Sequence, residues 1–125
     1  FGGNPVTSAA GLAFLNILRR DRLVERSAQL GEVLATSLAA LACRFEFIRE
    51  VRGLGLMRGL ELAAYGQRSP AELTDEILER LKDAGFLLGK TGAERNVLTW
   101  MPPLIITERQ IEEAVHALAG VLQSI

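Results

Sequence analysis

Two long helices are predicted for the first third of the chain from the spacing of its apolar residues. Between residues 5 and 20 these recur at helical intervals, as Val6, Ala9, Ala10, Ala13, Phe14, Ile17 and Leu18. Leu12 and Leu15 lie off that stripe, and a helix apolar on more than one side is typically buried between two bodies. If it is exposed instead, we expect the chain to self-associate.

A second helix is predicted from about residue 22 to residue 43, with Asp21 as its N-terminal cap. One face carries a row of leucines, namely Leu23, Leu30, Leu34, Leu38 and Leu41. Cys43 closes this Leu- and Ala-rich stretch, which predicts a small buried hydrophobic side chain, with a reactive thiol as the alternative.

The pattern then changes to alternation, which predicts two strands. Apolar residues alternate with polar ones over residues 45–51, residues 52–55 form a glycine-containing turn, and alternation resumes over 56–62. Two strands joined in this way predict an antiparallel hairpin. Arg58 falls on the apolar face of the second strand, where a charged residue is unexpected.

Two capping boxes predict the starts of two further helices. Ser69 and Glu72 open a helix that Gly85 ends, and Thr107 and Gln110 open the last one. Between them we predict a short buried strand at 86–88, a polar loop at 90–96 and a strand at 97–100 stopped by two prolines. The sum is an α/β (α+β-like) fold: two long N-terminal helices, then a small three- to four-stranded sheet with two helices packed on one face.

Composition narrows the class of protein without naming an activity. A length of 125 residues allows one domain, and a net charge of −1 gives no reason to expect nucleic acid or an anionic membrane as a partner. No apolar run reaches the length of a membrane span, and a lone cysteine fits a cytoplasmic setting. With one histidine and one cysteine, a His/Cys-rich metal site is excluded.

Few residues stand out as candidate chemistry. Gly53, Gly55 and Gly59 have the wrong spacing for a dinucleotide-binding loop, and His116 on the last helix is expected to be a packing or surface residue. Thr99 and Trp100, just before the double proline, could line a pocket. The alternative is an edge strand that simply ends at its prolines.

The chain begins inside a turn, since residues 1–5 are Phe-Gly-Gly-Asn-Pro. Asn4 can cap the first helix, and Pro5 suits its first position. Free N–H groups at such a helix start can hold an anion. A first residue already inside a turn leads us to expect that a larger N-terminal part precedes it.

Three motifs in order resemble the C-terminal part of the class III, fold-type-I pyridoxal-phosphate aminotransferases. They are the Phe-Gly-Gly-Asn-Pro of residues 1–5, the Val-Arg-Gly-Leu-Gly-Leu-Met of residues 51–57, and the segment from Asn96-Val97-Leu98 through the Pro-Pro-Leu-Ile-Ile-Thr of residues 102–107. The resemblance covers essentially the whole chain. It implies that residues 1–125 are the small domain, with 1–43 as connecting helices and 44–125 as a sheet-and-helix subdomain.

The resemblance also implies pyridoxal 5′-phosphate as cofactor, an amino donor and a 2-oxo acid acceptor as substrates, and a homodimer. The family's cofactor lysine lies upstream of this stretch, and neither Lys82 nor Lys90 stands in its sequence context. No catalytic residue is therefore assigned here, and we expect the chain alone not to transaminate. A non-catalytic α/β interaction module and a phospholyase of the same family are the alternatives.

Three residues are carried over as site residues by the resemblance, and Trp100 joins them from the pocket argument above. Phe1 and Gly2 are the surviving members of a turn that binds the cofactor phosphate. Thr99 stands where many members place an arginine that pairs with the substrate carboxylate, so Thr99 and Trp100 are the substrate-binding candidates. Arg58 and Arg95 are the candidates to replace the missing charge, and ω-amino acids or amines enter the substrate choice.

Overall fold

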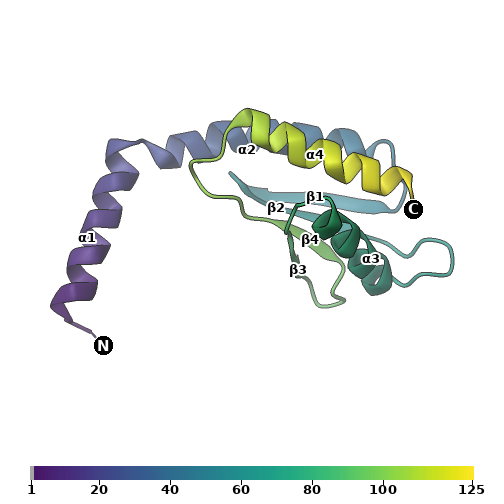
Figure 1. Cartoon of the computed structure of the whole chain (residues 1–125), viewed down its shortest axis with the longest axis horizontal. Coiled ribbons are helices and arrows are strands. Elements are labelled where there is room, and N and C mark those ends of the chain that lie inside the picture. The colour runs from purple at the N-terminus through teal and green to yellow at the C-terminus, as the bar shows by residue number, and fades with distance from the viewer. Residues whose placement is uncertain (1) are drawn as a thin grey trace.

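The computed structural model describes residues 2–125 and has four helices and a four-stranded antiparallel sheet (Figure 1). In chain order the elements are α1 (Pro5–Arg20), α2 (Leu23–Ala42), β1 (Ile48–Leu54), β2 (Met57–Leu62), α3 (Pro70–Asp83), β3 (Gly89–Thr91), β4 (Val97–Trp100) and α4 (Glu108–Gln123). The α/β class expected from the sequence is confirmed. Among residues 2–125, no helix has the combined length and hydropathy needed to cross a bilayer.

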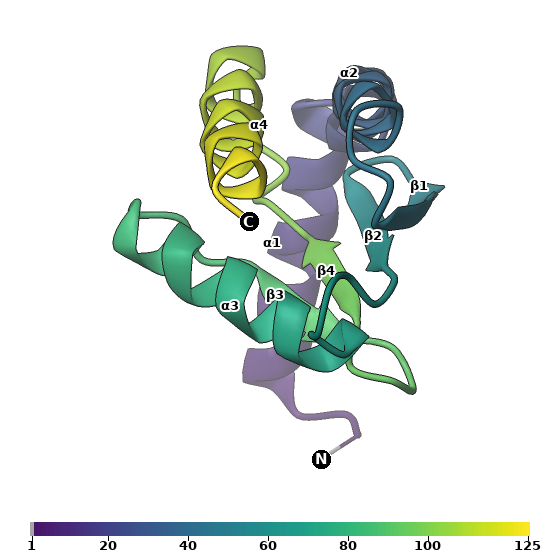
Figure 2. The same cartoon turned by 90° about the vertical axis from the view of Figure 1, so that its right-hand side faces the viewer.

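The sheet has the strand order β1-β2-β4-β3, and helices cover one of its faces (Figure 2). Side chains alternate along each strand, so that Leu60, Leu98 and Trp100 point to the covered face. There they meet the apolar faces of α2, α3 and α4 in one hydrophobic cluster. The sequence predicts two helices on this face, and α2 adds a third, because its leucine row packs over the hairpin.

Helix α1 extends away from this body (Figure 1). Asn4 caps it, with its side-chain oxygen accepting from the amides of Val6 (2.9 Å) and Thr7 (3.4 Å). None of its residues is buried, and several large apolar side chains are exposed, among them Leu12 and Phe14. The apolar character expected from the sequence is therefore present, without a covering surface among the described residues.

The second helix starts differently from the prediction. Its N-cap residue is Arg22, which has φ +49° and makes no side-chain capping bond. Asp21 instead ends α1, where Arg20 donates to both of its carboxylate oxygens at 2.7 and 2.9 Å. Asp21 as the cap of the second helix is therefore wrong, because its neighbour already holds the carboxylate.

Both predicted capping boxes are confirmed. At α3, Ser69 N–H and Oγ–H donate to the Glu72 carboxylate at 2.8 and 2.6 Å, while the Glu72 amide donates back to Ser69 Oγ at 3.3 Å. The same reciprocal arrangement joins Thr107 and Gln110 at α4. Local hydrogen bonds of this kind need only a four-residue stretch, which is why the sequence predicts them well.

The capping box at α3 makes stability depend on pH. Hydrogen bonds from the Ser69 side chain, and then from its backbone, lower the pKa of Glu72 below its ordinary 4.5. The stabilisation is present above that ordinary value and is lost as pH falls through the lowered one. We expect Glu72→Gln, which keeps an accepting oxygen, to be less stable than the wild type at pH 7, with the gap closing in acid. Urea unfolding at both pH values measures this, and a gap that persists in acid would contradict it.

Two strands have other boundaries in the structure than the sequence predicts. The first strand runs from Ile48 to Leu54 rather than over 45–51, because Phe45 and Phe47 join Tyr65 in an aromatic cluster before the strand. Residues 86–88 are not a strand, and β3 instead begins at Gly89 and takes up the first two residues of the predicted loop. Continued pairing would place 86–88 opposite 100–102, where a proline has no N–H to donate.

Cys43 is exposed at the end of α2, so the expectation of a buried side chain is wrong. The buried face of this helix is formed by Leu34, Leu38 and Leu41. Cys43 is already the C-cap residue, and the chain turns away there toward Phe45.

Candidate functional site

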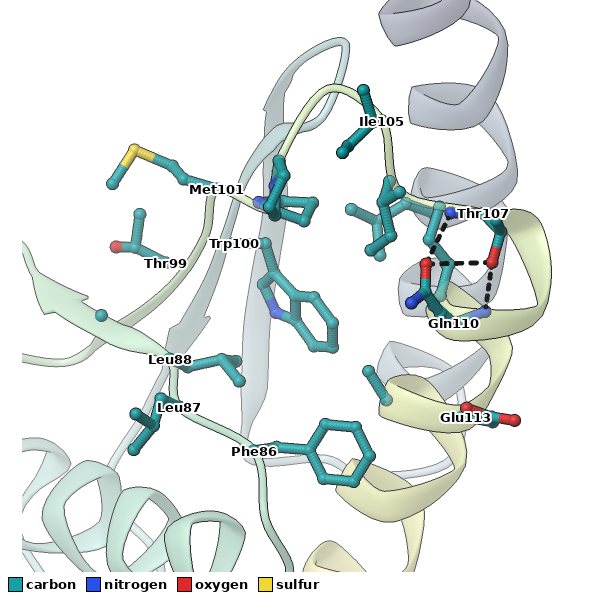
Figure 3. A pocket seen from close by; sticks show the side chains of 17 residues that line it. Phe86, Leu87, Leu88, Thr99, Trp100, Met101, Ile105, Thr107, Gln110 and Glu113 are labelled. Carbon is teal, nitrogen blue, oxygen red and sulfur yellow. Dashed lines mark hydrogen bonds between the residues drawn. The ribbon is translucent and has the colours of Figure 1, made fainter.

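A groove of about 850 Å³ opens beside β4, between residues 86–88 and the first turns of α4 (Figure 3). Its walls are mainly apolar, and Phe86, Leu88 and Ile105 are among the side chains that line it. The groove exists because β3 and β4 stop pairing at Gly89 and Thr99, after which the two segments diverge. Both Thr99 and Trp100 border it, as the sequence predicts for a pocket at this point.

The two residues nevertheless point to opposite sides of β4 (Figure 3). Trp100 is 5% exposed and faces the helices, whereas Thr99 is half-buried on the uncovered face. There its hydroxyl shares a 2.7 Å hydrogen bond with the hydroxyl of Thr91 on the neighbouring strand. Consecutive strand residues must diverge in this way. A single small group could therefore contact only one of the two side chains directly.

The indole N–H of Trp100 is buried and has no hydrogen-bond partner among the described residues. Buried polar groups are nearly always paired in folded proteins, because leaving a donor unmade costs free energy. This orphaned donor marks Trp100 as the most unusual side chain of the groove.

The turn before α1 has an open backbone. Gly3 has φ +80°, and an added Cβ would meet nothing within 4 Å at either Gly2 or Gly3. A ligand can therefore approach the backbone closely. Phe1 lies outside the described residues, so only Gly2 of the two candidates is placed by the structure. Helix α1 carries this turn away from the sheet, and the structure does not bring it together with the groove (Figure 1).

Arg58 joins the β1–β2 hairpin to α2 through a set of hydrogen bonds that we call the clasp. Its guanidinium donates to the carbonyl oxygens of Gly53 (2.9 Å), Gly55 (2.9 Å) and Gly31 (3.1 Å), and pairs with Glu32 at 3.1 Å. Its side chain is only 10% exposed. These contacts explain a charged residue on an apolar face, and they occupy the donors that a substrate would need. Arg95, the other candidate, is exposed in the turn between β3 and β4 with φ +56°.

A charged network on the uncovered face was missed by the sequence reasoning. Arg52 lies opposite Gly59, which in turn lies opposite Thr99, so the three share one row of the sheet. Arg52 Nη1 donates to Glu50 at 2.6 Å and to Glu61 at 2.5 Å. Hydrogen bonding to Glu61 raises the pKa of Arg52, which keeps it charged. Strand alternation alone could have placed these residues with Thr99 on the polar face.

Comparison with known proteins identifies the family. Residues 1–122 match the sequence family described as Aminotransferase class-III. The chain belongs to the class III aminotransferases. Over 120 residues it is 39% identical to the mitochondrial alanine–glyoxylate aminotransferase 2 homolog 2 of Arabidopsis thaliana. The alignment covers 94% of this chain and 25% of that relative.

Solved structures of class III aminotransferases and a phospholyase share the fold. A phospholyase from Arthrobacter, solved in complex with phosphoethanolamine, superposes with a TM-score of 0.91 at 34% identity, over 98% of this chain and 30% of that one. A Bacillus anthracis aminotransferase gives a TM-score of 0.87 at 29% identity, over 100% of this chain and 29% of that one. The chain thus spans less than a third of the length of each of these proteins.

The family implies pyridoxal phosphate, and the residues present fit only part of that cofactor. The backbone at Gly2 and Gly3 is open, but Asn4 already accepts from the Val6 and Thr7 amides at the start of α1, and both lysines are paired. Lys82 is paired with Glu79, whose hydrogen bond raises the pKa of that amine, and Lys90 is paired with Asp75. A nucleophilic amine must be neutral and available. Among residues 2–125 the structure therefore shows open space at the Gly2–Gly3 turn and both lysines engaged in ion pairs.

Proposed function

We propose that this chain is the C-terminal, small-domain part of a class III transaminase that moves an amino group from an amino acid or amine to a 2-oxo acid. The observation that carries the proposal is the family match over residues 1–122. Pyridoxal phosphate, when bound, supplies the electron sink for this chemistry. We further propose that the complete enzyme is a cytoplasmic homodimer.

In this proposal the chain contributes binding groups and no catalytic lysine. Phe1 and Gly2 belong to the turn that receives the cofactor phosphate, and the open space at Gly2 supports this role. Thr99 and Trp100 contact different parts of the substrate, because their side chains lie on opposite sides of β4. Because Thr99 offers a hydroxyl and no charge, the substrate end that meets it is not held by an ion pair there. The paired states of Lys82 and Lys90 support the proposal that this chain alone is inactive.

A phospholyase is the second candidate, favoured by the TM-score of 0.91 to the Arthrobacter phospholyase. Elimination from a phosphorylated amine releases phosphate and needs no 2-oxo acid. A non-catalytic interaction module is the third, and it would retain the fold without either reaction.

One assay separates the three candidates. The complete protein containing this chain is incubated with pyridoxal phosphate and an amine, with and without pyruvate, and in parallel with phosphoethanolamine. We expect amine consumption that depends on pyruvate, no phosphate release, and no turnover by the 125-residue chain alone. Phosphate release without pyruvate would show that the reaction is elimination instead of amino-group transfer. The absence of both reactions would support the interaction module. Turnover by the isolated chain would contradict its inactivity.

A further inference from the structure

The groove beside β4 combines a ligand-sized volume with a single unsatisfied donor. Its volume of about 850 Å³ lies in the range of small-molecule sites, and its walls are mainly apolar. Trp100 is 95% buried in its lining, and its indole N–H has no partner among the described residues. An occupant that brings an oxygen to this N–H removes the cost of an unmade hydrogen bond.

The side chain of Leu88 lies between the indole N–H of Trp100 and the groove. In the view of Figure 3 the nitrogen edge of the indole is turned toward Leu88. Leu88 is half-buried, its neighbour Leu87 is 85% exposed, and both belong to the stretch that forms no strand. Residues 86–88 lie outside the strands, so a rotation of Leu88 that opened the N–H to the groove would leave the pairing of β3 with β4 intact.

The charges of the groove select against an anion. Its described lining contains one carboxylate, Glu113, and no cationic side chain. At the start of α4 the backbone N–H of Gln110 donates to Thr107 Oγ1 at 3.3 Å. The capping box therefore already uses a backbone donor that an anion would need. An anionic ligand would lose its hydration without gaining a counter-charge.

We propose that this groove binds a neutral apolar group carrying one hydrogen-bond-accepting oxygen, such as a ketone, and that Trp100 Nε1–H donates to it. The inference rests on the substrate-binding role proposed above for Trp100, and it names the substrate part held on that side of β4 as uncharged. The carboxylate of a 2-oxo acid then lies outside this groove.

Three ligands with one carbon skeleton test the proposal on the 125-residue chain: 4-phenylbutan-2-one, butylbenzene and 4-phenylbutanoate. We expect the ketone to bind about three- to tenfold more tightly than the hydrocarbon, as one net hydrogen bond provides, and the carboxylate to bind more weakly than the ketone. Calorimetry measures the affinities. Emission of Trp100, the only tryptophan of the chain, reports whether binding occurs in this groove.

Two variants and a matched control give the test its specificity. Trp100→Phe keeps an aromatic ring and loses the N–H, so the preference for the ketone should disappear. Leu87→Asp should weaken binding of all three ligands, whereas Leu54→Asp, at an equally exposed leucine (84%) outside the groove, should not. Equal affinity for ketone and hydrocarbon, a preference that survives in Trp100→Phe, or equal effects of the two aspartates would overturn the inference.

This readout is independent of catalysis. Binding with the expected pattern supports the inference even if the complete protein fails to transfer an amino group, a failure that would overturn only the proposed function. Conversely, a complete protein that transaminates while this chain shows no preference for the ketone would overturn the inference and leave the proposed function standing.

Discussion

Gly31→Ala is expected to lower the free energy of unfolding by about 3 kcal/mol, at the upper end of overpacking effects. Gly31 lies inside α2 and faces the turn of the β1–β2 hairpin. A Cβ added there would lie 2.3 Å from the carbonyl carbon and oxygen of Gly55 and 2.5 Å from its Cα. The obstructing atoms are backbone, so no side-chain rotation relieves the contact. Either α2 or the hairpin must move.

The effect is measured by urea unfolding, with Gly120→Ala as the matched control. Gly120 also lies in a helix, α4, but an added Cβ there meets nothing within 4 Å. Alanine at this position should therefore stabilise the protein by about 0.5–1 kcal/mol, because alanine loses less backbone entropy on folding than glycine does. If both substitutions shift stability in the same direction, the close approach of α2 to the hairpin is not a constraint.

Arg58→Met is expected to cost about 3 kcal/mol, because it removes a largely buried charged donor from three carbonyl oxygens. The clasp joins Gly31 on α2 to Gly53 and Gly55 on the hairpin, so its loss also loosens the junction that Gly31 makes possible. Arg58→Lys should recover less than half of the loss. A lysine ammonium lacks the planar fork that reaches carbonyls in two directions.

Urea unfolding of Arg49→Met provides the comparison for Arg58. Arg49 also lies in the hairpin, but its side chain is 69% exposed, and its one ion pair within residues 2–125, to Glu61, is 3.4 Å long. Exposed pairs of this kind contribute little, so we expect a change within about 0.5 kcal/mol. Equal losses from Arg49→Met and Arg58→Met would mean that the clasp does not stabilise the fold.

The sequence predicted the helices and their capping boxes because those features depend on neighbours a few residues away. It also predicted the hairpin, and it left a pocket near Thr99 and Trp100 open as the alternative to an edge strand ended by prolines. Three short motifs carried the resemblance to the family. It placed the third strand wrongly, since the end of pairing depends on the prolines of a different segment meeting residues 86–88. It also misplaced Cys43, because the Leu- and Ala-rich composition runs up to a residue at which the helix has already ended.

By itself, then, the sequence determined the four helices, the β1–β2 hairpin and the resemblance to the family. The tertiary structure alone decided what Arg58 does, because its three carbonyl partners come from two elements whose approach no local pattern encodes. It alone showed that Trp100, in the wall of an apolar groove, has a buried N–H without a partner among residues 2–125. Periodicity reports which face of an element is apolar, whereas close contacts and missing partners arise only when distant segments pack together.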